Sequence, residues 1–227
     1  MNRLTSIPFR VNRNDLLKRL HLEPDSEMTA DILELATRAE AVGRPKAVYD
    51  SVAIDSKECG GITVRGVRFT SQAMAKNLEK VDRIYPYVCT CGTELDDLPI
   101  PDDGGFARFA LDMIKEMALR KASEALQAEL LKEFQLDKKA SMNPGSGDRK
   151  VWPIEEQAPL FRLLGDVTGA IGVTLTESFL MLPNKSVSGF YFKTDHEYHN
   201  CQLCQRAECP SRSAPFDPVL WESSFLP

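Results

Sequence analysis

The chain has 227 residues, a formal net charge of −5 and a hydrophobic content of 43%, which is ordinary for a globular protein. A negative net charge does not provide the positively charged surface that binds nucleic acid, so we expect no nucleic-acid partner. The N-terminus lacks the apolar run of a secretory signal, and no window approaches 18 uninterrupted apolar residues. We therefore expect a cytoplasmic protein that does not contact a membrane.

Apolar residues at helical spacing predict the helices of the chain. Gly43 and Pro45 end the second of them. The longest begins after two aspartates, whose charge suits the positive end of a helix dipole. The expected helices cover residues 13–22, 27–42, 73–78, 106–136 and 155–165.

Residues rich in β-branched and aromatic side chains predict strands between these helices. The Gly60-Gly61 pair marks a turn between two of them, and Pro183-Asn184 marks a hairpin joining the last two. Residues 140–150 are dense in turn formers and predict a loop. The tail from residue 210 to 227 predicts an extended segment held by Phe216, Trp221 and Phe225. The expected strands cover residues 46–56, 62–69, 81–90, 173–181 and 186–192.

Three of the six cysteines follow the last expected strand in a C-x2-C-x4-C-Pro pattern. In a reducing compartment this spacing indicates metal binding or redox chemistry, and a proline after the last cysteine is typical of ferredoxin-type loops. We expect Cys201, Cys204 and Cys209 to bind one metal centre. For an iron–sulfur cluster the preferred fourth ligand is Cys59, with Cys89 or Cys91 behind it. For zinc it is His199 or His196, and a chain without metal remains the third alternative.

The C-terminal half carries four motifs in a fixed order. They are Pro144-Gly145, Leu160-Phe161-x-Leu163-Leu164, Ile171-Gly172-x-x-Leu175-Thr176-Glu177-Ser178 and Ser186-Val187-Ser188-Gly189-x-Tyr191-Phe192. Together they resemble the activation domain of cobalamin-dependent methionine synthase. The resemblance is strong over residues 105–192 and looser over 30–104. It implies an α+β fold with a twisted antiparallel sheet flanked by helices. We expect this body to cover residues 1–195, followed by a cysteine-rich metal-binding tail over 196–227.

The resemblance also implies the ligand-contacting residues. Glu124 matches a family carboxylate, and Pro144-Gly145 matches part of the family's R-x-x-P-G-Y loop. In that loop Ser141 replaces the arginine and Ser146 replaces the tyrosine, so a bidentate partner for a ligand carboxylate is missing. Arg149 is a candidate substitute. The expected cofactor-binding set is Glu124, Pro144, Gly145, Ser146, Ser188, Gly189, Tyr191 and Tyr198, and no catalytic residue is assigned.

The bland interpretation of Glu124 is a solvated helix carboxylate paired with a neighbouring lysine or arginine.

Two functions remain open. In the first, the chain reductively activates a corrinoid protein or cobalamin-dependent methyltransferase. It returns cob(II) to an active state with a low-potential electron donor, acting as a corrinoid reductase or with S-adenosylmethionine as methyl donor. In the second, it is a non-catalytic binding module stapled by structural zinc.

Overall fold

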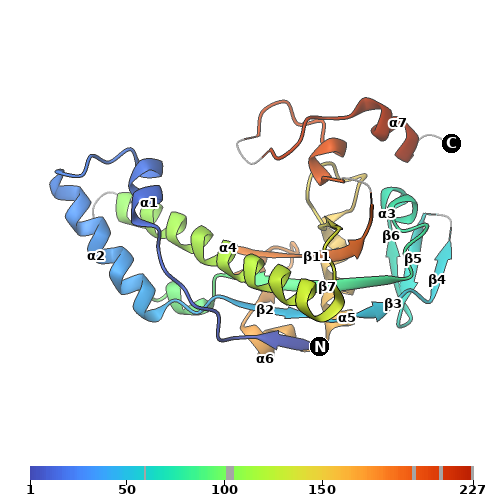
Figure 1. Cartoon of the computed structure of the whole chain (residues 1–227), viewed down its shortest axis with the longest axis horizontal. Coiled ribbons are helices and arrows are strands. Elements are labelled where there is room, and N and C mark those ends of the chain that lie inside the picture. The colour runs from blue at the N-terminus through green and yellow to red at the C-terminus, as the bar shows by residue number, and fades with distance from the viewer. Residues whose placement is uncertain (59, 101–104, 196–197, 210–211, 226–227) are drawn as a thin grey trace.

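A twisted antiparallel sheet runs through the middle of the chain in the computed structural model, which describes residues 1–58, 60–100, 105–195, 198–209 and 212–225 (Figure 1). Its strands lie in the order β1 (Asn2–Leu4), β2 (Lys46–Tyr49), β7 (Arg83–Thr90), β11 (Ser186–Lys193) and β8 (Lys139–Met142). A short strand, β3 (Val52–Ala53), also pairs with β7. The predicted α+β fold with a twisted antiparallel sheet is confirmed.

The register of β11 places alternate residues on opposite faces of the sheet. Tyr191 lies opposite Tyr85 of β7 on one side and Ser141 of β8 on the other. Phe190, its neighbour, points to the other face and lies opposite Met142. One face of the sheet is therefore tyrosine-rich, and the other is lined by phenylalanine and aliphatic residues.

The tyrosine-rich face is covered by α4 (Phe106–Phe134), the longest helix of the described chain (Figure 1). Its C-terminal half packs Ala122, Leu126 and Leu130 against the sheet. Its N-terminal half packs against α1 (Arg13–Leu20) and α2 (Glu27–Val42), around a separate cluster that includes Cys91. The apolar stripe of α4 moves around the helix along its length, so its two halves pack against different neighbours.

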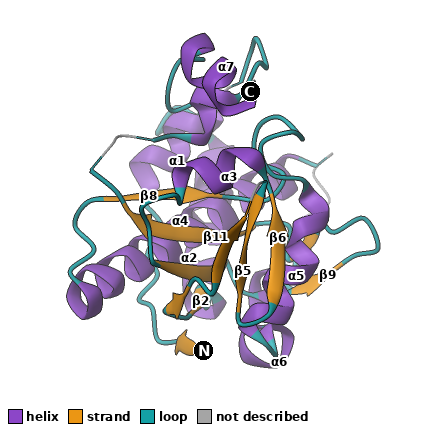
Figure 2. Ribbon diagram, turned by 90° about the vertical axis from the view of Figure 1, so that its right-hand side faces the viewer, coloured by secondary structure: helices purple, strands orange, loops and turns teal. Residues whose placement is uncertain are grey.

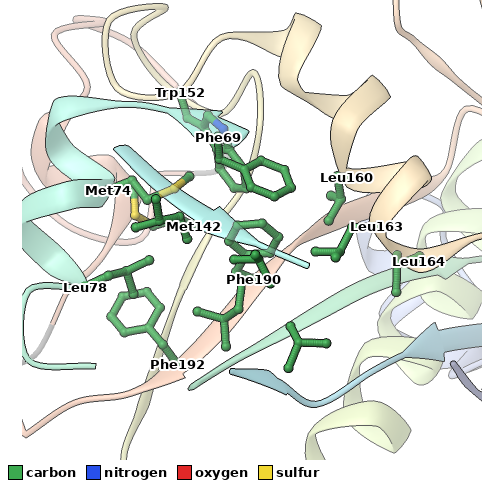
Figure 3. Close-up of a cluster of buried hydrophobic side chains, with 14 of the residues drawn as sticks. Phe69, Met74, Leu78, Met142, Trp152, Leu160, Leu163, Leu164, Phe190 and Phe192 are labelled. Atoms are coloured by element: carbon green, nitrogen blue, oxygen red, sulfur yellow. The ribbon is translucent and has the colours of Figure 1, made fainter. Parts of the chain in front are cut away.

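The opposite face carries the largest core cluster, shown in Figure 3. Phe190 meets the ring of Phe69 at 4.9 Å and that of Trp152 at 4.8 Å between centroids. These contacts join the main sheet to a three-stranded sheet and to the helices beside it. The elements are β4 (Ser56–Glu58), β5 (Gly61–Val64), β6 (Val67–Thr70), α3 (Gln72–Asn77), η2 (Ile154–Glu156), α5 (Gln157–Leu164) and α6 (Val167–Ile171).

The C-terminal segment lies over one end of the sheet, beyond β8 in Figure 2. It contains a 3-10 turn, η3 (Asn200–Leu203), and a helix, α7 (Pro218–Phe225). Leu203 is fully buried in the large core cluster, and Trp221 and Phe225 pack against it. The tail is thus partly helical, and the prediction of an extended segment is wrong over α7. Pro218 is the first residue of α7. Proline is tolerated there because the first turn of a helix has no hydrogen-bond partner for the backbone N–H that proline lacks.

Three other local predictions are wrong. Residues 139–142 form a strand where a loop was expected. The expected hairpin does not form, because β9 (Thr174–Leu175) pairs with β10 (Met181–Leu182), while β11 pairs with β7 and β8. The expected strand over 62–69 is itself a hairpin of β5 and β6.

The remaining short element is η1 (Thr93–Leu95). In the described ranges, no helix combines the length and the apolar character needed to cross a bilayer.

Candidate functional site

The Pro-Gly loop, residues 143–147, follows directly on β8 and begins with Asn143, whose side chain joins three segments. Its Nδ2 donates to the Tyr87 hydroxyl and to the Ser188 carbonyl, both at 2.7 Å. Its Oδ1 accepts from Nδ2 of Asn200 at 2.8 Å. The Ser146 amide then donates to the Asn143 carbonyl at 3.1 Å and closes the turn. One asparagine therefore fixes the loop to the sheet and to the C-terminal segment.

Gly189 allows this arrangement because the backbone of β8 passes close to it. A Cβ at this position would lie 2.2 Å from the Met142 carbonyl oxygen and 2.6 Å from Nδ2 of Asn143. Such distances are far below van der Waals contact, so the strand accepts only glycine here without moving. The structure therefore brings the predicted residues Pro144, Gly145, Ser146 and Gly189 around a single junction.

Tyr191 and Tyr87 form a stacked pair beneath α4, with ring centroids 4.6 Å apart. Burial raises the pKa of Tyr191 to about 12, and it raises the pKa of Tyr87 well above its ordinary value. Gln127 of α4 hydrogen-bonds the Tyr191 hydroxyl. Both phenols are therefore protonated hydrogen-bonding groups at neutral pH.

Glu124 lies three residues before Gln127, on the neighbouring part of the same helix face. Its side chain is 53% exposed and pairs with Lys121 at 2.7 Å. The helix thus places Glu124 on an exposed part of its surface, one turn from Gln127. The ion pair fits the bland interpretation of a solvated carboxylate, and the ligand-binding role stays a prediction.

Two other predicted residues point away from this junction. The Ser188 hydroxyl donates to Oε1 of the buried Gln157 at 2.8 Å, on the face opposite Tyr191. Only the backbone carbonyl of Ser188 belongs to the Asn143 junction. Tyr198 packs against the large core cluster, and burial raises the pKa of its phenol. Arg149, the candidate for the missing arginine, is exposed and pairs with Glu155 at 2.6 Å.

The cysteine loop, residues 198–209 with 212 and 213, lies directly against the Pro-Gly loop. A Cβ on Gly147 would come within 3.4 Å of the Cys204 Cβ and 3.6 Å of the Asn200 carbonyl oxygen. The Cys201 sulfur accepts hydrogen bonds from both the backbone amide and the hydroxyl of Ser213, each at 3.4 Å. Burial raises the pKa of the Cys201 thiol, but these bonds and the charge of Arg212 bring it below its ordinary value.

The described side chains do not gather three metal ligands at one point, neither here nor elsewhere in the ranges that the structure covers. The predicted ligands Cys59 and His196 lie outside the described residues. His199 is exposed and caps η3. Cys89 and Cys91 are fully buried against α4 and its neighbours, and burial raises the pKa of both thiols to about 12. Both thiols are therefore protonated at neutral pH in the metal-free chain.

Comparisons with known proteins agree with the predicted resemblance. Residues 117–212 match the family model described as "Vitamin B12 dependent methionine synthase, activation domain". A solved structure described as "Crystal Structure of the MetH Reactivation Domain bound to AdoHcy" shares the fold with a TM-score of 0.55 and 20% identity. The match covers 82% of this chain and 67% of that chain. No curated protein matches the chain.

Proposed function

We propose that this chain, whose residues 117–212 are similar to a vitamin B12-dependent methionine synthase activation domain, binds S-adenosylmethionine and reactivates a corrinoid held by another protein. The observation that supports this most is the convergence of the Pro-Gly loop with Gly189 and Tyr191 at one junction, inside the matched region. The related solved structure holds S-adenosylhomocysteine, the demethylated form of the same ligand.

The reaction has two steps. A low-potential one-electron donor reduces cob(II)alamin on the partner to cob(I)alamin. The cob(I) centre then attacks the methyl group of S-adenosylmethionine, which forms methylcob(III)alamin and releases S-adenosylhomocysteine. The chain's own contribution is to hold the sulfonium ligand on the Pro-Gly loop and to present its methyl group to the corrinoid. On this proposal, residues 1–195 form the ligand-binding body and 196–227 an appended segment.

We further propose that the cysteine loop delivers the electron. Its support is positional, because Cys204 lies against Gly147 at the tip of the Pro-Gly loop. An iron–sulfur cluster held by Cys201, Cys204 and Cys209 would supply a low-potential one-electron carrier there. Ser141 stands where the family's loop has an arginine, which weakens binding of the methyl donor. This replacement also favours electron delivery as the more important role of the chain.

Ligand binding is tested by calorimetry with S-adenosylmethionine and S-adenosylhomocysteine. Because Ser141 replaces the arginine, one charged hydrogen bond of about 1.5–3 kcal/mol is missing, and we expect affinity roughly tenfold to a hundredfold below that of a domain with the full loop. Glu124→Ala should weaken binding further, by about tenfold. The matched control is Glu133→Ala on the same helix, since Glu133 is 47% exposed and also pairs with a lysine. Equal affinities for the wild type and the Glu124 variant would remove Glu124 from the site.

Reactivation is tested by following visible absorbance of a cob(II)-loaded corrinoid partner mixed with this chain and a low-potential reductant. Methylcob(III) should form faster with the chain and S-adenosylmethionine than with either alone. If the chain accelerates neither cob(I) nor methylcob(III) formation, the proposed function is wrong. If Cys204→Ala accelerates the reaction fully, the cysteine loop does not deliver the electron.

A further inference from the structure

Alternate residues of β8 form a line on the tyrosine-rich face of the sheet. Ser141 lies opposite Tyr191, so its side chain is on that face, and alternation places Lys139 there too. Asn143, the next residue of the line, donates to the Tyr87 hydroxyl on the same face, which agrees with this alternation. Residues two apart on a strand are separated by about 6.7 Å, so the line runs from the Pro-Gly loop back to the start of β8.

This line of side chains is open to solvent. The helix α4 packs on β2 and β7, and its Gln127 hydrogen-bonds Tyr191 of β11 (Figure 1). Beyond β11, β8 is the last strand of the described sheet. The side chains of Lys139, Ser141 and Asn143 are each partly exposed. A ligand that occupies the Pro-Gly loop can therefore extend along β8.

Two cations face each other at the start of β8. Lys139 lies directly opposite Lys193 of β11, and like charges at opposed positions destabilise a sheet. Arg83 of β7 adds a third positive charge to this end of the face, because it alternates with Tyr85. Burial raises the pKa of Tyr85, and the charge of Arg83 opposes that effect, which agrees with their nearness.

The carboxylates at this end of the face interact with other lysines. Asp195 pairs with Lys138 at 3.4 Å. Backbone hydrogen bonds lower the pKa of the Asp137 carboxyl, and the charges of Lys193 and Lys138 lower it further. Within the described ranges, the Lys139 ammonium makes no hydrogen bond or ion pair. An anion from outside the chain would therefore relieve the repulsion between the two opposed lysines.

We infer that Lys139 binds the carboxylate of the amino-acid part of S-adenosylmethionine, with Lys193 adding its charge. The inference rests on the proposed function, which puts this ligand on the Pro-Gly loop at the other end of the same line. Lys139 thus determines specificity, because it favours ligands that carry a carboxylate. A lysine is a point charge without the planar fork of an arginine, so it recovers only part of the binding that the serine at position 141 loses.

The experiment compares two ligands by calorimetry on the full chain. They are S-adenosylmethionine and decarboxylated S-adenosylmethionine, which lacks only the carboxylate. The wild type should bind the first roughly tenfold to a hundredfold more tightly than the second. Lys139→Gln should remove this preference by weakening the first ligand alone, and Lys139→Arg should keep it. Lys193→Gln should reduce the preference by a smaller factor, roughly threefold.

A matched control and a stability measurement separate ligand contact from other roles. Lys138→Gln removes the same charge one residue away, from a side chain that is 66% exposed and pairs with Asp195, so the preference should stay unchanged. Without ligand, Lys139→Gln should keep or raise the temperature of thermal unfolding, because it removes the contact between like charges. A purely structural lysine would lower that temperature when replaced.

The outcomes distinguish the inference from the proposed function. A wild-type chain that binds neither ligand would overturn both. If the wild type binds both ligands equally, or if Lys139→Gln keeps the preference, the inference is wrong and the proposed function stands. The inference is also wrong if Lys138→Gln removes the preference as fully as Lys139→Gln does, because the general positive charge would then explain it.

Discussion

Asn143 provides a quantitative test of the junction between the sheet, the Pro-Gly loop and the cysteine loop. Asn143→Ala removes three hydrogen bonds of 2.7, 2.7 and 2.8 Å. A net contribution of about 0.5–1.5 kcal/mol for each bond gives a loss of about 1.5–4.5 kcal/mol in the free energy of unfolding. The upper part of this range applies if the Tyr87 hydroxyl, which is almost fully buried, finds no replacement donor.

The assay is equilibrium unfolding in urea, followed by tryptophan fluorescence and circular dichroism. The control Asn184→Ala changes an exposed asparagine outside the junction and should alter stability by less than about 0.5 kcal/mol. Asn200→Ala breaks only the third bond and should cost about 1 kcal/mol. A loss below about 1 kcal/mol for Asn143→Ala would refute the view that this side chain fixes the junction.

Two further perturbations test the fold that positions the site. Gly189→Ala forces a Cβ to within 2.2 Å of the Met142 carbonyl, so it should cost more than about 2 kcal/mol and increase hydrogen exchange along β8, whereas unchanged exchange there would contradict the close strand approach. Burial raises the pKa of Glu40, but the Val11 amide at 2.7 Å and the guanidinium groups of Arg13 and Arg10 hold that pKa below its ordinary value. Its stabilisation should therefore be complete above about pH 5 and be lost as the pH falls through the lowered pKa. Glu40→Gln should cost about 1–2 kcal/mol at pH 7 and make stability less dependent on pH below about pH 5 than in the wild type, and parallel curves would contradict this assignment.

The sequence predicts the longer helices well because helical periodicity is a local signal, whereas the fold class was implied by the resemblance to a known family. Residues 106–136, for example, show the apolar spacing of α4 without any knowledge of its partners. Strand pairing is not local. Residues 139–142 become a strand only because Phe190 and Phe192, some fifty residues later, offer them a sheet edge. The same reason explains the misassigned hairpin, since β11 takes β7 as its partner in preference to the adjacent residues 174–182.

The candidate site was predictable only where a motif marks it. Pro144-Gly145 and Gly189 stand in recognisable patterns, and the structure brings them together. Asn143 was missed, because an asparagine before Pro-Gly is indistinguishable from an ordinary turn residue. Its role arises from partners that only the folded chain brings together. The Ser188 hydroxyl could have been assigned to the opposite face from the strand alternation itself.

The strand order has a consequence for synthesis of the chain on the ribosome. The strand β11 lies between β7 and β8, yet it is made long after both of them. Until residue 193 has left the exit tunnel, β7 has a free edge on that side and β8 has no partner in the sheet. An unpaired hydrophobic strand edge readily pairs with another chain, which leads to aggregation. Nascent chains truncated before β11 should therefore be bound by chaperones or aggregate, and those released after it should not.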